Sequence, residues 1–72
     1  MAILLDCGKW KVMVDQVYLD DDGSVCYDNI LCVYDLIADT SCTGKLATNT
    51  VYNLIPSQIF IEALKRAVDS NE

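Results

Sequence analysis

The chain has 72 residues, 53% of them hydrophobic, and five basic against eleven acidic side chains give it a net charge of −6. This length predicts one small domain over residues 1–72 with more apolar side chains than its core can enclose, so we expect a homo-oligomer, a dimer first of all. The acidic balance repels phosphate backbones and excludes direct electrostatic binding of nucleic acid. The absence of a membrane-spanning apolar run and of a secretory leader predicts a cytoplasmic protein without membrane contact.

Four apolar stretches between polar turns predict β-strands. They cover Ala2–Asp6, Trp10–Asp20, Val25–Ile37 and Lys45–Ile55, and the last of them alternates between apolar and polar residues. β-Branched and aromatic residues favour a strand at Trp10–Asp20, and cysteine, valine and tyrosine favour one over residues 29–38. Residues 29–38 also fit a helical stripe, and a helix there is the alternative prediction.

The Asp22-Gly23 pair predicts a hairpin between the second and third stretches. If these two residues form the loop, Tyr18 faces Tyr27 across the strands. Asp15-Gln16 then lies opposite Asp28-Asn29, so both strands lose their apolar character at the same level, as they would at a β-bulge. Apolar residues on both faces of this hairpin predict a sheet that is covered on both sides or curled into a small barrel.

The carboxyl end predicts an amphipathic helix over residues 57–69. Pro56 ends the preceding stretch, Ser57 is a suitable N-cap, and apolar residues from Phe60 to Val68 fall on one stripe. The expected fold class is therefore α+β. It combines a β-rich part over residues 2–55, as a small antiparallel sheet or partly closed barrel of about four strands, with one C-terminal amphipathic helix packed on it.

The acidic stretch YLDDDGSVCY, residues 18–27, has some features of a calcium-binding loop. With Gly23 at loop position six, Asp20 and Asp22 occupy liganding positions, but Tyr18 stands at position one and Asn29 at position twelve. The first ligand and the closing carboxylate are missing, so the stretch is interpreted as a hairpin corner. Its carboxylates form an acidic contact point for lysine or arginine of a partner, and we predict that Asp20, Asp21, Asp22, Tyr18 and Tyr27 bind that partner.

Four cysteines offer an alternative function, a thiol-based zinc or redox protein. Cys7, Cys26, Cys32 and Cys42 have no zinc-knuckle spacing, and the chain contains no histidine. Buried free thiols are therefore the favoured interpretation, and no metal or other cofactor is expected. Four thiolates that meet in space would still make a tetrahedral zinc site.

The sequence predicts a non-catalytic protein. Without histidine the commonest general base is missing, and the carboxylates form no recognisable catalytic set. We therefore expect an acidic protein-binding domain, a small regulator or virus-encoded inhibitor of a basic or nucleic-acid-handling partner protein. A further alternative is an oligomer that binds a small molecule or nucleotide at a subunit interface.

Overall fold

A computed structural model describes residues 2–70, so residues 1, 71 and 72 of the predicted domain lie outside the described range. Four strands precede two helices in the chain. The elements are β1 (Ile3–Cys7), β2 (Trp10–Leu19), β3 (Val25–Asp35), β4 (Thr40–Thr43), α1 (Gly44–Asn53) and α2 (Ser57–Ser70). Neither helix is long and apolar enough to cross a membrane.

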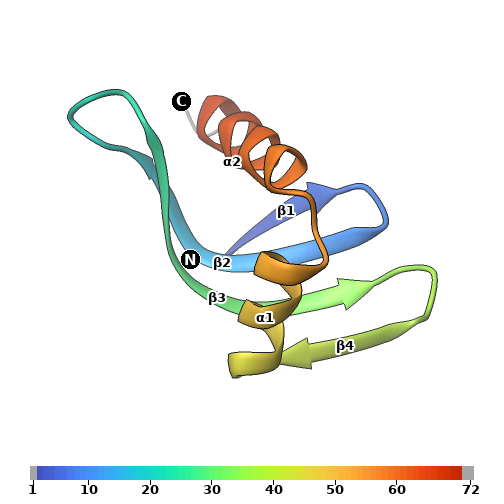
Figure 1. The fold of residues 1–72 in the computed structure, drawn as a ribbon. Helices are drawn as coiled ribbons and strands as arrows, with labels where there is room; N and C mark the ends of the chain where they lie inside the picture. The colour runs from blue at the N-terminus through green and yellow to red at the C-terminus, as the bar shows by residue number, and fades with distance from the viewer. Residues whose placement is uncertain (1, 71–72) are drawn as a thin grey trace.

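The strands form one antiparallel sheet in the order β1-β2-β3-β4. Figure 1 shows that each strand lies beside its neighbour in sequence and that the long β2–β3 hairpin curls up beside α2. The predicted α+β class and four-stranded antiparallel sheet are confirmed, and the sheet is open rather than closed into a barrel.

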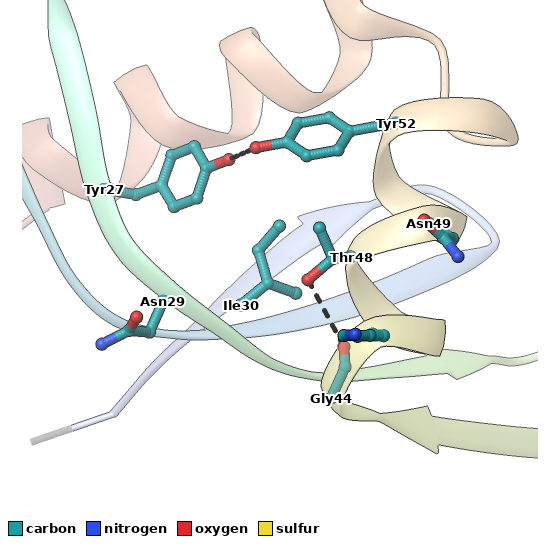
Figure 2. A pocket seen from close by; sticks show the side chains of 8 residues that line it. Tyr27, Asn29, Ile30, Gly44, Thr48, Asn49 and Tyr52 are labelled. Atoms are coloured by element: carbon teal, nitrogen blue, oxygen red, sulfur yellow. Dashed lines mark hydrogen bonds between the residues drawn. The ribbon is translucent and has the colours of Figure 1, made fainter.

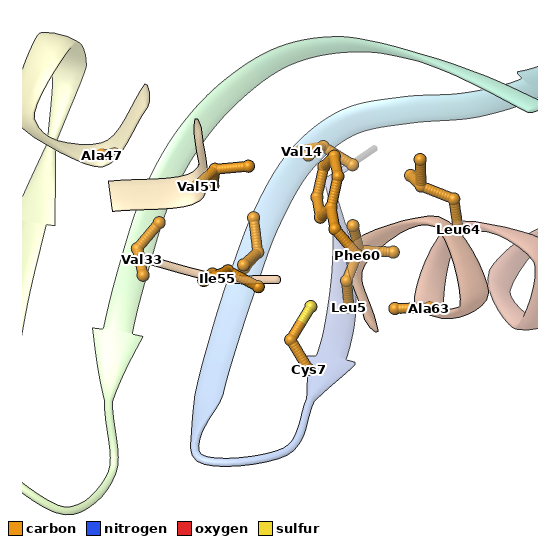
Figure 3. Packing of buried hydrophobic residues seen from close by; sticks show 11 residues of the cluster. Leu5, Cys7, Val14, Val33, Ala47, Val51, Ile55, Phe60, Ala63 and Leu64 are labelled. Carbon is orange, nitrogen blue, oxygen red and sulfur yellow. The ribbon is translucent and has the colours of Figure 1, made fainter. Parts of the chain in front are cut away.

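Both helices bury apolar side chains against one face of the sheet. On that face Leu5, Val12 and Val33 follow one another across three strands and are almost fully buried. The two helices and the segment that joins them add side chains to the same cluster, which Figure 3 shows: Ala47 and Val51 from α1, Ile55 from the connection, and Phe60, Ala63 and Leu64 from α2. The opposite face, here called the outer face, carries Leu4 and Met13, which are paired across β1 and β2 and are 60% and 37% exposed.

The predicted strand at Lys45–Ile55 is wrong, because α1 occupies most of this stretch. Ala47 and Val51 lie one helical turn apart and are both buried. The alternating residues that favoured a strand are largely exposed on the helix, as Leu46 and Tyr52 show. The alternating residues predicted a strand, whereas the two buried residues, Ala47 and Val51, have the spacing of a helix.

The helix predicted over residues 57–69 is confirmed as α2, which ends at Ser70. It buries Phe60, Ala63 and Leu64, three members of the predicted stripe. The expectation of a single helix is corrected, because α1 precedes α2. The alternative helix over residues 29–38 is also wrong, since β3 continues to Asp35 and a turn follows.

The predicted hairpin exists, but its register differs near the tip. Val12 pairs with Val33 as predicted, whereas Tyr18 pairs with Cys26 and Val17 pairs with Tyr27. The loop between the strands is longer than two residues, since β2 ends at Leu19 and β3 begins at Val25. This loop length changes the pairing by one position and separates Tyr18 from Tyr27.

A register shift between Met13 and Val14 accounts for the change of pairing along the hairpin. Asn29, next to this irregularity, has a φ of 47°, a left-handed conformation that asparagine tolerates better than most residues. Its side-chain amide donates to Asp15 Oδ2 at 3.1 Å, which joins the two strands at this level. The predicted bulge is thus present within a few residues of its expected place.

Candidate functional site

The loop at the tip of the β2–β3 hairpin uses two of its carboxylates to fold itself. The Asp20 N–H donates to Ser24 O at 2.8 Å, and the Gly23 N–H donates to Asp20 O at 2.9 Å. Asp20 Oδ1 accepts from the Asp21 N–H at 2.9 Å, and Asp22 Oδ1 accepts from the Ser24 N–H at 3.0 Å. The Asp21 carboxylate takes no part in these bonds, and all three aspartates are exposed.

A local bond favours the ionised form of one of the three carboxylates, that of Asp22. The Ser24 backbone N–H lowers the pKa of Asp22, because a hydrogen bond to the ionised carboxylate favours that form. Gly23 has a φ of 88°, a conformation that glycine adopts without the steric cost of a side chain. The loop therefore presents Asp20, Asp21 and Asp22 together, as predicted, in a closed turn.

The two predicted tyrosines lie on opposite sides of the hairpin. Tyr18 follows Val17, which packs against the core, so Tyr18 faces away from the helices. It is 42% exposed, and the nearby Asp28 carboxylate raises its pKa by disfavouring a second negative charge. The structure thus brings Tyr18, but not Tyr27, to the outward side next to the acidic tip.

Tyr27 connects the hairpin to both helices, as Figure 2 shows for its contact with α1. Its hydroxyl shares a hydrogen bond of 2.5 Å with the hydroxyl of Tyr52. Its ring meets Phe60 of α2 edge-on, with the ring centroids 5.2 Å apart and the planes at 81°. Burial, followed by the bond to Tyr52, raises the pKa of Tyr27 to about 12.

The distribution of charge along the chain is a feature that the predicted site residues captured only in part. Between Lys11 and Lys45 the sequence has seven carboxylates and no basic side chain. These carboxylates belong to Asp15, Asp20, Asp21, Asp22, Asp28, Asp35 and Asp39. The gap between the two lysines is visible in the sequence and could have identified the whole hairpin as acidic.

The outer half of the hairpin, residues 15–28, is here called the distal hairpin. It holds five of these seven carboxylates and two exposed large apolar side chains, Tyr18 and Leu19. Leu19 is 53% exposed at the end of β2, next to the acidic loop. The distal hairpin therefore combines exposed apolar contact area with surrounding negative charge.

The four cysteines are not brought together. Cys7 is buried in the core, where the loss of solvation raises the pKa of its thiol. Cys42 lies on the helix side of β4, with Sγ 3.6 Å from Thr50 Oγ1, while Cys32 lies in the outer-face row with Met13. Cys26 pairs with Tyr18 near the tip. Within residues 2–70, no three His, Cys, Asp or Glu side chains are grouped so that they could hold a metal ion.

A surface groove of about 570 Å³ lies between β3 and α1 (Figure 2). Its polar lining includes the hydroxyls of Tyr27 and Tyr52, the amides of Asn29 and Asn49, and the ammonium group of Lys45. Both asparagines and Tyr52 are exposed, so the walls of the groove belong to the molecular surface. Ligand pockets usually enclose most of their ligand behind apolar walls, and this open polar groove differs from that pattern.

Comparisons with known proteins give no family assignment. Searches against protein-family models, curated proteins and solved structures each find no match. The proposed function is therefore argued from the geometry and charge of the residues described above.

Proposed function

We propose that this chain is a non-catalytic protein-binding domain that docks its distal hairpin on a basic surface of a partner protein. The observation that carries the proposal is the presence of exposed Tyr18 and Leu19 together with five carboxylates in one segment, the distal hairpin, that has no basic residue. Neither of these two apolar side chains is buried in the core of the chain, so both are free to be buried by a partner.

The two components of the distal hairpin have different physical roles. Clustered carboxylates attract a basic surface during the encounter and raise the association rate, an effect that salt weakens over about 8–10 Å. Aromatic side chains such as Tyr18 are common anchors in the desolvated centre of an interface. Asp20, Asp21 and Asp22 would select the partner by charge, and Tyr18 would hold it.

We assign Tyr27 a positioning role within this proposal. Its contacts with Tyr52 and Phe60 fix the distal hairpin against both helices and leave its hydroxyl already bonded. A hairpin held in one orientation loses less conformational freedom when it binds than a mobile one.

The class of partner follows from charge. Proteins that handle nucleic acids carry basic patches for phosphate, and a dense row of carboxylates is complementary to such a patch. We therefore propose a regulator or inhibitor of a nucleic-acid-handling protein, of which virus-encoded inhibitors are one form. Cytoplasmic action agrees with four cysteines that are all free, because the cytoplasm keeps thiols reduced.

The test is a comparison of three forms of the protein as bait in host-cell extract, followed by binding measurements with the purified partner. The variant D20N/D21N/D22N changes the net charge from −6 to −3 while each asparagine Oδ1 can still accept the loop bonds. The matched control D35N/E62Q/D69N removes the same charge outside the distal hairpin. We expect the first variant to weaken binding about tenfold or more and to flatten its salt dependence, and the control to bind nearly as the wild type does.

Equal loss of binding in both triple variants would show that only net charge matters. Undiminished binding of D20N/D21N/D22N would show that the partner contacts another surface. Either outcome would overturn the assignment to the distal hairpin.

A further inference from the structure

The free edge of β1 has backbone groups that no strand pairs. Leu36 N–H donates to Lys9 O at 2.9 Å, so Lys9 and the alternate residues after it on β2 direct their backbone groups toward β3. The residues between them, Trp10, Val12 and Val14, therefore direct theirs toward β1, where they pair with Cys7, Leu5 and Ile3. It follows that Leu4 and Asp6 direct their N–H and C=O groups away from the sheet.

A hydrogen bond to one of these groups, the Asp6 carbonyl, confirms that it points away from the sheet. The Arg66 Nη2 of α2 donates to Asp6 O at 2.8 Å. A carbonyl oxygen has a second lone pair, so Asp6 O can still accept another hydrogen bond. The remaining outward groups of Leu4 and Asp6 are the two N–H donors and Leu4 O.

The helix next to this edge leaves the edge accessible. A groove of about 330 Å³ runs between β1 and α2. The helix lines it with Ala63, Ala67 and Ser70, which are small, and with Arg66. Arg66 is the only large side chain among these four, and it contacts the edge at Asp6 O. The small residues leave room for an added strand beside the rest of the edge.

We propose that β1 pairs in antiparallel fashion with β1 of a second copy of this chain, so that two sheets join into one across a two-fold axis at Leu5. In this register Leu4 of each copy pairs with Asp6 of the other, and both residues of each pair have outward backbone groups. The edge is thus complementary to itself, as an isologous two-fold interface requires. The proposal does not depend on the proposed partner of the distal hairpin.

The side chains on the outer face fit this arrangement. Leu4 pairs with Met13 within one copy and lies diagonally across the new strand pair from Leu4 of the second copy. Leu4 and Met13 of the two copies would thus form a diagonal apolar strip across the joined sheets, flanked by Asp6 of each copy. Leu4, which is 60% exposed in the single chain, would lose part of this exposure in the dimer.

The arrangement of charge also favours this edge over other surfaces for self-association. Four of the five basic residues lie in the β1–β2 turn, at the start of β2 and on α2: Lys9, Lys11, Lys65 and Arg66. Because the two β1 strands run in opposite directions, the two distal hairpins point to opposite ends of the joined sheet. The interface therefore avoids the region where two copies with a net charge of −6 would repel each other most strongly.

The experiment uses sedimentation equilibrium of the full chain at several concentrations. We expect a dimer for the wild type and a dissociation constant raised about tenfold or more for Leu4→Pro, which removes one outward N–H from each copy. Proline is tolerated at an edge position whose N–H faces solvent, so the subunit should keep its far-UV circular dichroism. The control Leu4→Thr keeps the N–H and should remain a dimer at concentrations where Leu4→Pro is monomeric.

A second measurement does not depend on the proline variant folding. Amide exchange of the wild type should slow at Leu4 and Asp6 as the protein concentration rises, because these N–H groups are bonded only in the dimer. A wild type that stays monomeric, a Leu4→Pro dimer of unchanged strength, or exchange at both amides that is independent of concentration overturns the proposal.

Discussion

The two halves of the β2–β3 hairpin differ in what covers them. Close to the helices, Val12, Val14 and Val33 are almost completely buried, whereas in the distal hairpin Tyr18 and Leu19 are largely exposed. Both halves have the residue composition of strands, and backbone pairing continues through both. The comparison teaches that burial by α1 and α2, rather than strand formation itself, separates the structural half of the hairpin from the half that is available to a partner.

The largest expected difference concerns two leucines. Leu5→Ala removes a side chain that is 1% exposed and should lower the free energy of unfolding by about 2–5 kcal/mol. Leu19→Ala removes the same atoms from a 53% exposed position and should change it by less than about 0.5 kcal/mol. Urea denaturation measures both. A large cost for Leu19→Ala would show that the distal hairpin contributes to the core, against the comparison above.

The boundary between the two halves is tested at Asn29. Asn29→Ala places an ordinary side chain at a φ of 47° and should cost about 1–2 kcal/mol in unfolding free energy. Asn29→Gly also loses the bond to Asp15 but relieves the backbone, so it should cost less. If the glycine variant is as unstable as the alanine variant, the bond and not the backbone conformation determines the cost.

The connection between the distal hairpin and the helices is tested at the two bonded tyrosines. Tyr27→Phe removes the hydroxyl that bonds Tyr52 and should cost about 0.5–1.5 kcal/mol, while the ring contact with Phe60 remains. Tyr52→Phe removes the same bond from the other side. The double variant should therefore cost less than the sum of the two single variants, which a double-mutant cycle by denaturation measures. Strictly additive costs would contradict an energetic role for the bond.

The same bond predicts how stability depends on pH. The pKa of Tyr27 is raised to about 12 in the folded chain, from an ordinary value near 10. The folded state therefore holds this proton more tightly, and the stability that it contributes is complete below pH 10 and is lost as the pH rises toward 12. Tyr27→Phe should lose less stability than the wild type over this interval, measured by denaturation at fixed pH steps. Equal losses of stability in the wild type and Tyr27→Phe would show that other tyrosines cause the pH dependence.

The smallest effect is expected at the acidic tip. D20N/D21N/D22N should change the unfolding free energy by no more than about 0.5 kcal/mol, because the residues are exposed and asparagine retains the acceptor atoms of the loop. Thermal or urea unfolding gives the result. A stability loss above that range would mean that weakened partner binding by this variant also reflects a damaged hairpin.

Much of the fold could be predicted from local patterns. The Asp22-Gly23 corner and the apolar stretches on either side of it predicted the hairpin, and Pro56 followed by Ser57 predicted the start of α2. These features depend on neighbours in sequence, which carry most of the information for turns and helix ends. The loop length was not predictable in this way, since a hydrogen bond from the Asp20 N–H to Ser24 O closes a wider turn.

The parts that could not be predicted depend on contacts between distant segments. Residues 45–55 alternate like a strand, and only the sheet beneath Ala47 and Val51 reveals which residues form the buried side. The pairing of Tyr18 with Tyr27 failed for a related reason, because the register shift near Val14 changes which side chains face each other. Of the candidate site, the acidic tip was predictable, while the separation of its two tyrosines was not.

The order of the strands has a consequence for how the chain folds. Every strand pairs with the strand that precedes or follows it, so the sheet can assemble by closing short loops one after another, which favours rapid folding. The contact of Arg66 with Asp6 spans 60 residues and joins the last helix to the first strand. We expect this contact to form after the transition state for folding. Substitutions at Arg66 should therefore accelerate unfolding and leave the folding rate nearly unchanged.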